Sequence, residues 1–214
     1  MASYSDTAQS TVSPGLIVVF SAPSGAGKTS VLHKLFERMP ELLFSVSVTT
    51  RQPRSGERNG LDYHFISERE FDERIQRDEF VEWAEVHGHR YGTLKNAVDS
   101  AVSDGHTIIL DTDTVGAFNI KRQYPHAVLI FIAPPSPEVL RHRLESRNTE
   151  SQDKVEKRLS AMPREMRRMK EYDFIVVNNS LQTAVGQVES ILTAEAMRSE
   201  RVLPTLTSWR NYLE

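Results

Sequence analysis

The chain has 214 residues, of which 26% are charged and 39% are hydrophobic, and its formal net charge is −3. This composition is ordinary for a globular protein, and the slightly acidic balance argues against broad, non-specific binding to nucleic acid, which requires a basic surface. The sequence contains no cysteine, which excludes disulfides, thiolate metal sites and a cysteine nucleophile.

The first residues are polar. Residues 1–13 are rich in Ser and Thr and contain neither a basic nor an apolar stretch, so we expect a disordered N-terminal tail rather than a signal peptide. The apolar runs further along the chain, such as AVLIFIA at 127–133, are too short to cross a bilayer. We therefore expect a cytoplasmic protein that does not contact membranes.

Short apolar runs predict strands that are covered on both faces. They are Leu16 to Phe20, Thr107 to Leu110, Ala127 to Ile132 and Phe174 to Val177. Between them, apolar residues recur at helical spacing, notably over 31–39 and 181–192. Strands that alternate with helices predict an α/β fold in which helices flank a parallel sheet.

Two segments interrupt this alternation within a predicted domain of residues 14–214. Residues 47–96 are polar with short alternating pieces and predict a small, mostly-β insertion, while residues 146–170 are densely charged and predict a helical, mobile lid segment. The predicted core then consists of residues 14–46, 97–145 and 171–203. The last ten residues carry no pattern that we can assign.

The stretch VFSAPSGAGKTS, residues 19–30, follows the first predicted strand and opens a predicted helix. Gly27, Lys28 and Thr29 fit the end of the phosphate-loop pattern G-x-x-x-x-G-K-[ST], while Ala22 takes the place of its first glycine. That position only has to permit the turn out of the strand, so alanine can serve there if its φ is negative.

A loop of this kind turns its backbone N–H groups inward onto phosphate oxygens. Lys28 would then reach the β and γ phosphates of a nucleotide, and the Thr29 hydroxyl could reach Mg²⁺. The alternative is a Gly-rich turn that contains a lysine by chance. Alone, the loop indicates only a nucleotide phosphate, and the residues predicted to bind it are Ala22, Pro23, Ser24, Gly25, Ala26, Gly27, Lys28, Thr29 and Ser30.

The insertion carries a second motif, SVTTRQPRSGERNGLDYHF at 47–65, followed by EFVEWAEVHGHRYGT at 79–93. Arg51, Arg54 and Arg58 could make forked contacts to a phosphate, or they could form a solvated surface. Together with the loop, these segments resemble the guanylate kinase family, whose pattern S-x-T-T-R-x-P-R-x-G-E-x-x-G-x-D-Y-x-F is present with its spacing. The resemblance covers about residues 15–200.

The resemblance implies the nucleoside-monophosphate-kinase type of P-loop fold and transfer of the γ-phosphoryl group of ATP to GMP, with dGMP left open as a second acceptor. It implies that the GMP phosphate contacts Arg51, Arg54, Tyr63 and Tyr91, that Ser47, Glu82 and Thr93 face the guanine, and that Gly92 also belongs to the GMP site. Ser47 can donate to guanine O6, and the Glu82 carboxylate can accept from N1–H and the 2-amino group. Packing roles for the two tyrosines are the alternative, and the sequence leaves open which face of its strand Glu82 occupies.

The stretch TIILDTDTVGAF, residues 107–118, places two aspartates at the carboxyl end of a predicted strand, where ligands bind in open α/β sheets. The family pattern there is L-D-I-D-x-Q-G-A, and Thr112 and Val115 depart from it. We expect Asp111 and Asp113 in the GMP site. Capping of the next helix is an alternative role for Asp113, and it is compatible with function.

The lid segment and the helix before it contain arginines that match family arginines approaching the ATP phosphates; a solvated charged helix is the alternative. The expected catalytic residues are Lys28, Arg51, Arg143, Arg147 and Arg158. Asn148 replaces a family glycine, which we expect to stiffen the hinge. Pro163 falls where the family continues a helix, so we expect a break or kink there.

The sequence therefore predicts an ATP:GMP phosphotransferase that uses Mg²⁺ with ATP and needs no nucleic acid, membrane or obligatory protein partner. Two alternatives are a catalytically inactive guanylate-kinase-like scaffold that binds a protein, and another small phosphate-ester kinase on the same fold. The presence of Lys28, Thr29 and the complete GMP-site set weighs against both.

Overall fold

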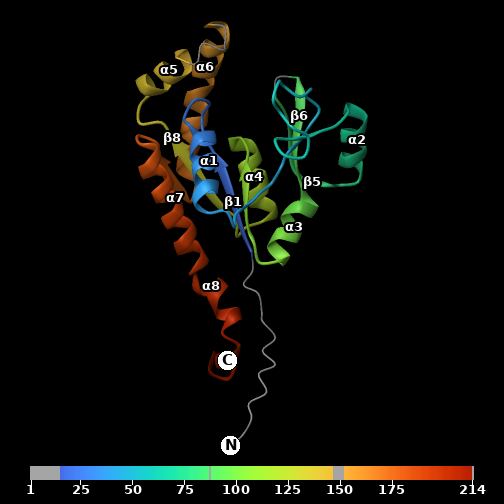
Figure 1. The fold of residues 1–214 in the computed structure, drawn as a ribbon, viewed down its shortest axis with the longest axis vertical. Helices are drawn as coiled ribbons and strands as arrows, with labels where there is room; N and C mark the ends of the chain where they lie inside the picture. Colours follow the sequence, from blue (N-terminus) through green and yellow to red (C-terminus); the bar gives the residue numbers. More distant parts are fainter. Residues whose placement is uncertain (1–14, 87, 147–151, 214) are drawn as a thin grey trace, which may run out of the picture.

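The computed structural model of the chain describes residues 15–86, 88–146 and 152–213. A five-stranded sheet forms its centre, with the strand order β2-β7-β1-β8-β9 and parallel pairing throughout (Figure 1). Its strands are β1 Leu16–Ser21, β2 Leu43–Phe44, β7 Thr107–Asp111, β8 Val128–Ala133 and β9 Phe174–Val177. The predicted parallel sheet is confirmed, and the short edge strand β2 is an addition that the apolar runs did not indicate.

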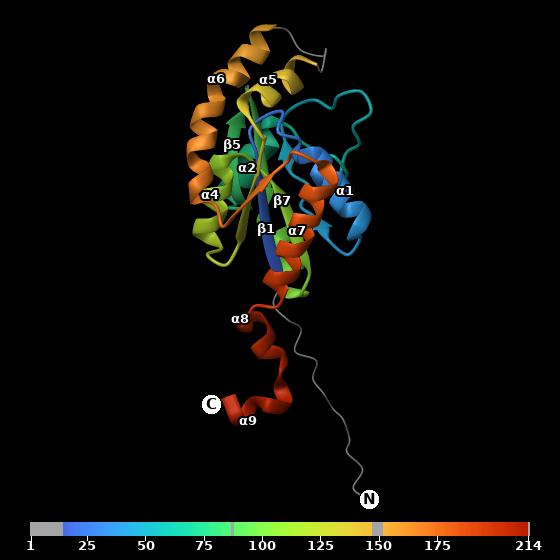
Figure 2. The same cartoon turned by 90° about the vertical axis from the view of Figure 1, so that its left-hand side faces the viewer.

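Helices cover both faces of this sheet, as Figure 2 shows. The helices concerned are α1 Lys28–Arg38, α3 Lys95–Ser103, α4 Thr114–Gln123 and α7 Leu181–Ala196. One apolar cluster joins α1 and α7 to the sheet, and a second joins α3 and α4 to its other face. Every residue of β1 and β8 is buried between these layers, which explains why their sequences are continuous apolar runs.

A second, four-stranded sheet has the order β4-β3-β6-β5. Its strands are β3 Val48–Thr49, β4 His64–Phe65, β5 Phe80–Val86 and β6 His89–Leu94. Helix α2, Glu68–Gln76, packs on it through Phe71, which lies in a small core with Val48 and Phe80. The sequence analysis missed α2, although Ser67 is followed by Glu70 at capping-box spacing and its Oγ accepts the Glu70 N–H at 3.1 Å.

The charged segment 146–170 is helical from residue 152 onward, within the part that the structure describes. Helix α5 spans Pro137–Glu145, α6 spans Gln152–Arg168, and the 3-10 turn η1 spans Met169–Glu171. The expected break at Pro163 is wrong, because α6 continues through it. Proline removes one backbone hydrogen bond, but Leu159 and Met162 pack against α5 and Met166 packs on the main core, so contacts before and after Pro163 hold the helix in place.

The C-terminal residues extend away from the body of the protein (Figures 1 and 2). They form short elements: α8 Ser199–Val202, η2 Leu203–Thr205, η3 Thr207–Trp209 and α9 Arg210–Leu213. Trp209 and Tyr212 are exposed and contact each other, with ring centroids 5.8 Å apart. No helix in the described part of the chain combines the length and the apolar character needed to cross a membrane.

Candidate active site

The phosphate loop connects β1 to α1 and turns at two glycines. Gly25 and Gly27 have φ values of 89° and 91°, which a residue with a Cβ rarely adopts. Asp78 is the only non-glycine residue with a positive φ among the described positions. Ala22 therefore has a negative φ, which is the condition under which alanine can replace the first glycine of the pattern.

Side chains from two other parts of the chain contact this loop. The Ala26 carbonyl oxygen accepts from Nδ2 of Asn178 at 2.8 Å and from Nη1 of Arg143 at 3.2 Å. From α6, Nη1 of Arg158 donates to Oγ of Ser24 at 2.7 Å. Two of the predicted catalytic arginines thus lie at the loop, while Arg147 and Asn148 lie outside the described residues. Sequence reasoning missed Asn178, although it stands in the segment YDFIVVNNSL that resembles the family.

Lys28 begins α1 and reaches across to the carboxyl end of β7. Its ammonium group forms an ion pair with Asp111 and donates to the Thr112 carbonyl oxygen at 3.0 Å. Thr29 and Ser30, the next residues of the helix, are exposed. The loop lysine and the first of the two predicted strand-end aspartates are therefore direct neighbours.

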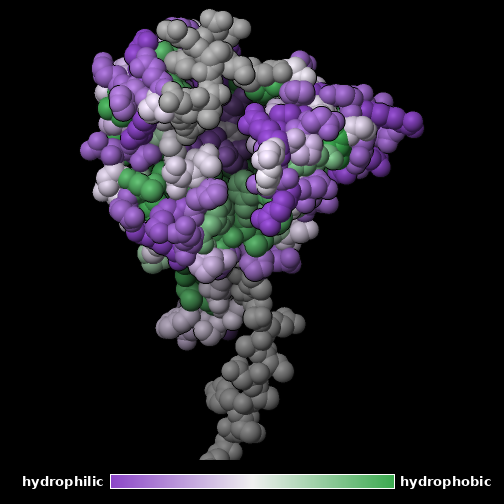
Figure 3. Space-filling view, turned by 45° about the horizontal axis from the view of Figure 1, so that its top comes forward, coloured by the Kyte–Doolittle hydropathy of each residue, from purple (hydrophilic) through white to green (hydrophobic). Residues whose placement is uncertain are grey.

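A cavity of about 260 Å³ joins the loop, the end of β7 and the second sheet. Its lining consists of Lys28, Ser47, Tyr63, Glu82, Ala84, Val86, Tyr91, Gly92, Asp111, Thr112 and Asp113. Hydrophilic residues predominate on the surface of the insertion (Figure 3). Most of the predicted GMP-site residues thus meet in one place; Arg51, Arg54 and Thr93 do not line this cavity.

Glu82 lies on β5 opposite Thr93 of β6 and is 9% exposed. Its Oε1 accepts the Thr93 hydroxyl at 2.8 Å. Burial raises the pKa of Glu82 from 4.5 to about 7, with a contribution from Asp113, while the Thr93 hydroxyl lowers it. The other oxygen faces α4, where a Cβ added to Gly116 would come within 2.8 Å of it.

A β-bulge decides which face Glu82 occupies. The pairing of β5 with β6 shifts between Phe80 and Glu82, so one extra residue is accommodated in β5. Phe80 and Trp83 both pack on Phe71, with ring centroids at 4.5 Å and 6.1 Å. Residues three apart in an unbulged strand would point to opposite faces, so the bulge allows Glu82 to face the cavity while both aromatic residues face α2.

Arg51 lies beside this cavity in a forked ion pair with Glu57. Its Nη1 and Nη2 donate to the two carboxylate oxygens of Glu57 at 3.0 Å and 2.9 Å. Its guanidinium lies over the ring of Tyr63, 5.4 Å from the centroid, and Tyr63 contacts Tyr91 with centroids 6.0 Å apart. Glu57 also accepts the N–H of Arg54 at 2.7 Å. Glu57 belongs to the motif at residues 47–65, but the sequence alone gave no indication of this role.

Asp113 caps helix α4. Its Oδ1 accepts the N–H of Val115 at 2.9 Å and that of Gly116 at 2.8 Å, so the capping role considered for this residue is present. The side chain also lines the cavity, and capping therefore does not remove it from the site. Val115, which replaces the family glutamine, is exposed.

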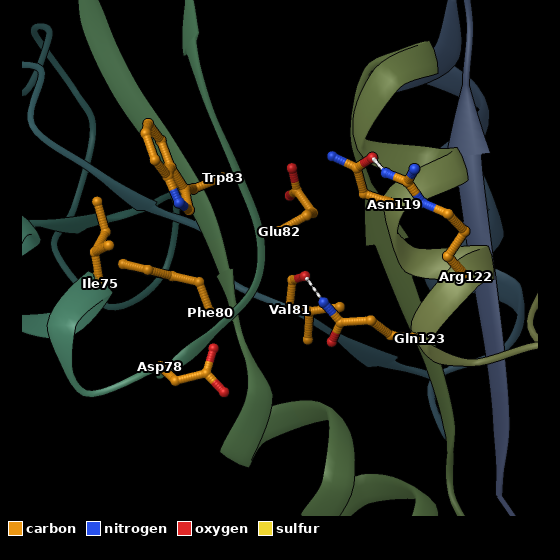
Figure 4. A pocket seen from close by; sticks show the side chains of 9 residues that line it. All are labelled: Ile75, Asp78, Phe80, Val81, Glu82, Trp83, Asn119, Arg122 and Gln123. Atoms are coloured by element: carbon orange, nitrogen blue, oxygen red, sulfur yellow. Dashed lines mark hydrogen bonds between the residues drawn. The ribbon is translucent and has the colours of Figure 1, made fainter.

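A second cavity of about 340 Å³ is lined by residues of β5 and α4 and by Ile75 and Asp78, and it shares Glu82 with the first cavity (Figure 4). Gln123 of α4 donates from Nε2 to the Val81 carbonyl oxygen at 2.6 Å. The side chain of Val81 is buried in the main core. Strand β5 is thus attached to the central domain at the level of Val81, one residue before Glu82.

Comparison with known proteins identifies relatives that match most of this chain in sequence and in fold. The family model described as guanylate kinase matches residues 15–195. The guanylate kinase of Myxococcus xanthus is 45% identical over 196 residues, covering 91% of this chain and 94% of the relative. That of Thermotoga maritima is 45% identical over 187 residues, covering 87% and 90%. The crystal structure of guanylate kinase from Anaplasma phagocytophilum has a TM-score of 0.75 at 34% identity, covering 92% and 95%. This chain therefore belongs to the guanylate kinase family.

Proposed function

We propose that the chain transfers the γ-phosphoryl group of ATP to GMP, giving ADP and GDP. The observation that carries this proposal is the shared cavity, in which Lys28 of the phosphate loop and Glu82 of the second sheet line the same space. A donor phosphate at the loop and an acceptor nucleotide at the sheet would then meet. Phosphoryl transfer depends mainly on such positioning and on charge neutralisation.

The loop would bind the triphosphate of ATP. Its backbone N–H groups and the N-terminus of α1 favour negative charge. Lys28 is paired with Asp111, and binding of ATP would bring a second negative group to the same ammonium. We propose that the phosphates take over part of this interaction and that Asp111 keeps Lys28 oriented until they arrive.

Glu82 would select guanine. When ionised, its carboxylate can accept hydrogen bonds from N1–H and from the 2-amino group, while Ser47 donates to O6. Adenine lacks both donors at these positions, so the buried carboxylate would receive no hydrogen bond from the base and would keep only the one from Thr93 that the structure shows. Sites that rely on such polar pairing reject the wrong analogue by about 10⁴-fold or more.

The phosphate of GMP would bind beside Arg51, Tyr63 and Tyr91. Glu57 fixes the guanidinium plane of Arg51 with two hydrogen bonds, so that the group is oriented before the ligand arrives. Arg54 is exposed at the edge of the same loop, and its side chain would add a second positive charge. Forked contacts of this kind suit phosphate oxygens.

Arginines of the lid and of α5 would neutralise the charge that moves between the two nucleotides. Arg143 and Arg158 donate to oxygen atoms of the phosphate loop, which holds them close to where the β and γ phosphates would bind. We propose the same role for Arg147. A lid closed over the site would also exclude water, which otherwise competes with GMP as the acceptor.

The donor atoms near the loop fit a Mg²⁺ ion that arrives with ATP. The Thr29 hydroxyl and the carboxylates of Asp111 and Asp113 are hard oxygen ligands of the type Mg²⁺ takes, directly or through water. We propose that Thr29 holds the ion. When bound with ATP, the ion would supply positive charge that neutralises the phosphates. Within the described residues, no group of three or more His, Asp or Glu side chains is arranged to hold a metal.

The test is a coupled assay of ADP release with Mg-ATP and with GMP, dGMP, AMP, UMP or CMP as acceptor. We expect turnover with GMP, none in Lys28→Ala, and reduced discrimination against AMP in Glu82→Gln. Turnover with another phosphate ester instead of GMP would favour a different kinase. Binding of GMP without turnover in any combination would favour the inactive scaffold.

A further inference from the structure

The peptide group between Ala26 and Gly27 lies in the glycine-rich turn of the phosphate loop. Both neighbours of Ala26 are glycines with positive φ, Gly25 at 89° and Gly27 at 91°. Glycine passes between positive and negative φ without the steric penalty that a Cβ imposes. Nothing in the local sequence therefore prevents this peptide plane from turning over, and something outside the loop has to fix it.

Asn178 contacts this peptide group directly. Its Nδ2 donates to the Ala26 carbonyl oxygen at 2.8 Å, and its side chain is buried, with the residue 6% exposed. A carbonyl oxygen only accepts, so the amide nitrogen must be the atom that faces it. A Cβ on Gly27 would overlap that nitrogen, which shows how closely the two segments approach.

The backbone of Asn178 is fixed on both sides. Its N–H donates to the Ala133 carbonyl at the end of β8 at 2.8 Å, and its own carbonyl accepts from Nη2 of Arg143 at 3.0 Å. The residue directly follows β9. Asn178 therefore reaches the loop from the end of the edge strand β9 of the central sheet.

In a trans peptide, the C=O and N–H groups point in opposite directions, and the described residues contain no cis peptide bond. The hydrogen bond from Asn178 holds the Ala26 carbonyl toward Asn178. The N–H of Gly27 must then point away from Asn178, and we infer that this is the side on which phosphate oxygens would bind. A turned-over peptide would present a carbonyl dipole to the same phosphate.

Arg143 donates to the same carbonyl, but it lies on α5 next to the lid segment, and its guanidinium has a proposed role at the phosphates of ATP. If it contacts those phosphates, Asn178 is left as the side chain that holds Ala26. We propose that Asn178 is a positioning residue for the phosphate donor, because it fixes the direction of the Gly27 N–H. This inference rests on the proposed function, since it assumes that the loop binds ATP.

The experiment compares Asn178→Ala and Asn178→Asp with the wild type, and uses Asn179→Ala as the matched control. Asn179 is adjacent and exposed. In the coupled assay, we expect Asn178→Ala to raise the KM for ATP about tenfold, a typical effect of losing one buried hydrogen bond, and to change the KM for GMP less than twofold. The control should match the wild type.

Asn178→Asp has the same shape but loses the donor when it is ionised. At pH 8, we expect Asn178→Asp to raise the KM for ATP, relative to the wild type at the same pH, more than Asn178→Ala does. At pH 5.5, the KM of Asn178→Asp should return part of the way to the wild-type value, because the protonated carboxyl can donate to the Ala26 oxygen again. A role limited to packing would leave this isosteric variant close to the wild type at both values.

Calorimetric titration with ATP in the absence of GMP, together with thermal unfolding, separates the possible failures. If the wild type binds ATP but does not phosphorylate GMP, the proposed function fails while weaker ATP binding in Asn178→Asp still supports the inference. If the wild type phosphorylates GMP and Asn178→Ala has an unchanged KM for ATP, or an equal rise in both KM values, the inference fails alone. If Asn178→Ala does not fold, ATP binding by Asn178→Asp tests the inference: weaker binding than in the wild type supports it, and equal binding contradicts it.

Discussion

The hydroxyl of Thr93 donates a hydrogen bond of 2.8 Å to Oε1 of Glu82, and the two residues are paired on neighbouring antiparallel strands. Both residues are buried; burial raises the pKa of Glu82, the Thr93 hydroxyl lowers it, and the resulting pKa is about 7. The carboxylate proposed to read guanine therefore changes its protonation state near neutral pH. Three of the following predictions depend on this pair.

The KM for GMP should depend on pH through Glu82. Guanine N1–H and the 2-amino group require an ionised acceptor, so the protonated enzyme binds GMP poorly. With a pKa of about 7, we expect the KM for GMP to rise about tenfold from pH 8 to pH 6. The GMP phosphate titrates in the same range, so the comparison is the ratio to Glu82→Gln, which should lack this component. A constant ratio would contradict the prediction.

The same substitution should stabilise the unliganded protein above pH 7. The pKa of Glu82 is raised on folding, so the folded state is favoured by protonation and loses stability as pH rises from about 4.5 to about 7. A change from 4.5 to about 7 corresponds to roughly 3 kcal/mol. Urea unfolding at pH 8 should show Glu82→Gln more stable by up to about this amount, and the gain should vanish near pH 4.5.

Removal of the Thr93 hydroxyl should shift the pH dependence upward. Thr93→Val keeps the shape of the side chain but withdraws the hydrogen bond that lowers the pKa of Glu82. We expect a higher KM for GMP at pH 7 and a smaller difference from the wild type at pH 9, where Glu82 is ionised in both proteins. An increase of the same size at every pH would indicate that Thr93 acts by contacting guanine directly.

Gly116 should be required for the position of Glu82. A Cβ at this site would overlap Oγ1 of Thr112 and come within 2.8 Å of Oε2 of Glu82. Gly116→Ala should therefore raise the KM for GMP more than the KM for ATP in steady-state assays. Gly186→Ala is the control, because a Cβ there meets nothing within 4 Å; in the middle of α7 it should leave both KM values unchanged and stabilise the protein by up to about 1 kcal/mol.

Local patterns predicted the parts of the site that depend on a few consecutive residues. The phosphate loop follows from a buried strand, two glycines and a lysine, and Ala22 fits because the turn out of β1 needs only a negative φ there. Four of the five strands of the central sheet were visible as apolar runs, most clearly β1 and β8, whose two faces are both covered; the two-residue edge strand β2 was not. Each of these patterns lies within one loop or one strand, so it can be recognised in the sequence without knowledge of tertiary contacts.

Other features depend on contacts between distant residues. The face of β5 that carries Glu82 is set by a bulge that brings Phe80 and Trp83 onto Phe71 of α2, and no local alternation encodes it. Continuity of α6 through Pro163 depends on packing against α5 and the main core, which outweighs the local preference of proline. The link from Asn178 to Ala26 joins residues 152 positions apart, beyond the reach of motif spacing.

The packing of Phe80 and Val81 affects whether the insertion, residues 47–96, can be exchanged between members of this family. These neighbours on β5 belong to different cores, Phe80 to that of the insertion and Val81 to that of the central domain. A graft that replaces residues 47–96 with the equivalent region of another relative would therefore also replace one side chain of the recipient's main core. Such a chimera should fold well only if its donor supplies a residue of similar volume at position 81, whatever nucleotide the grafted region recognises.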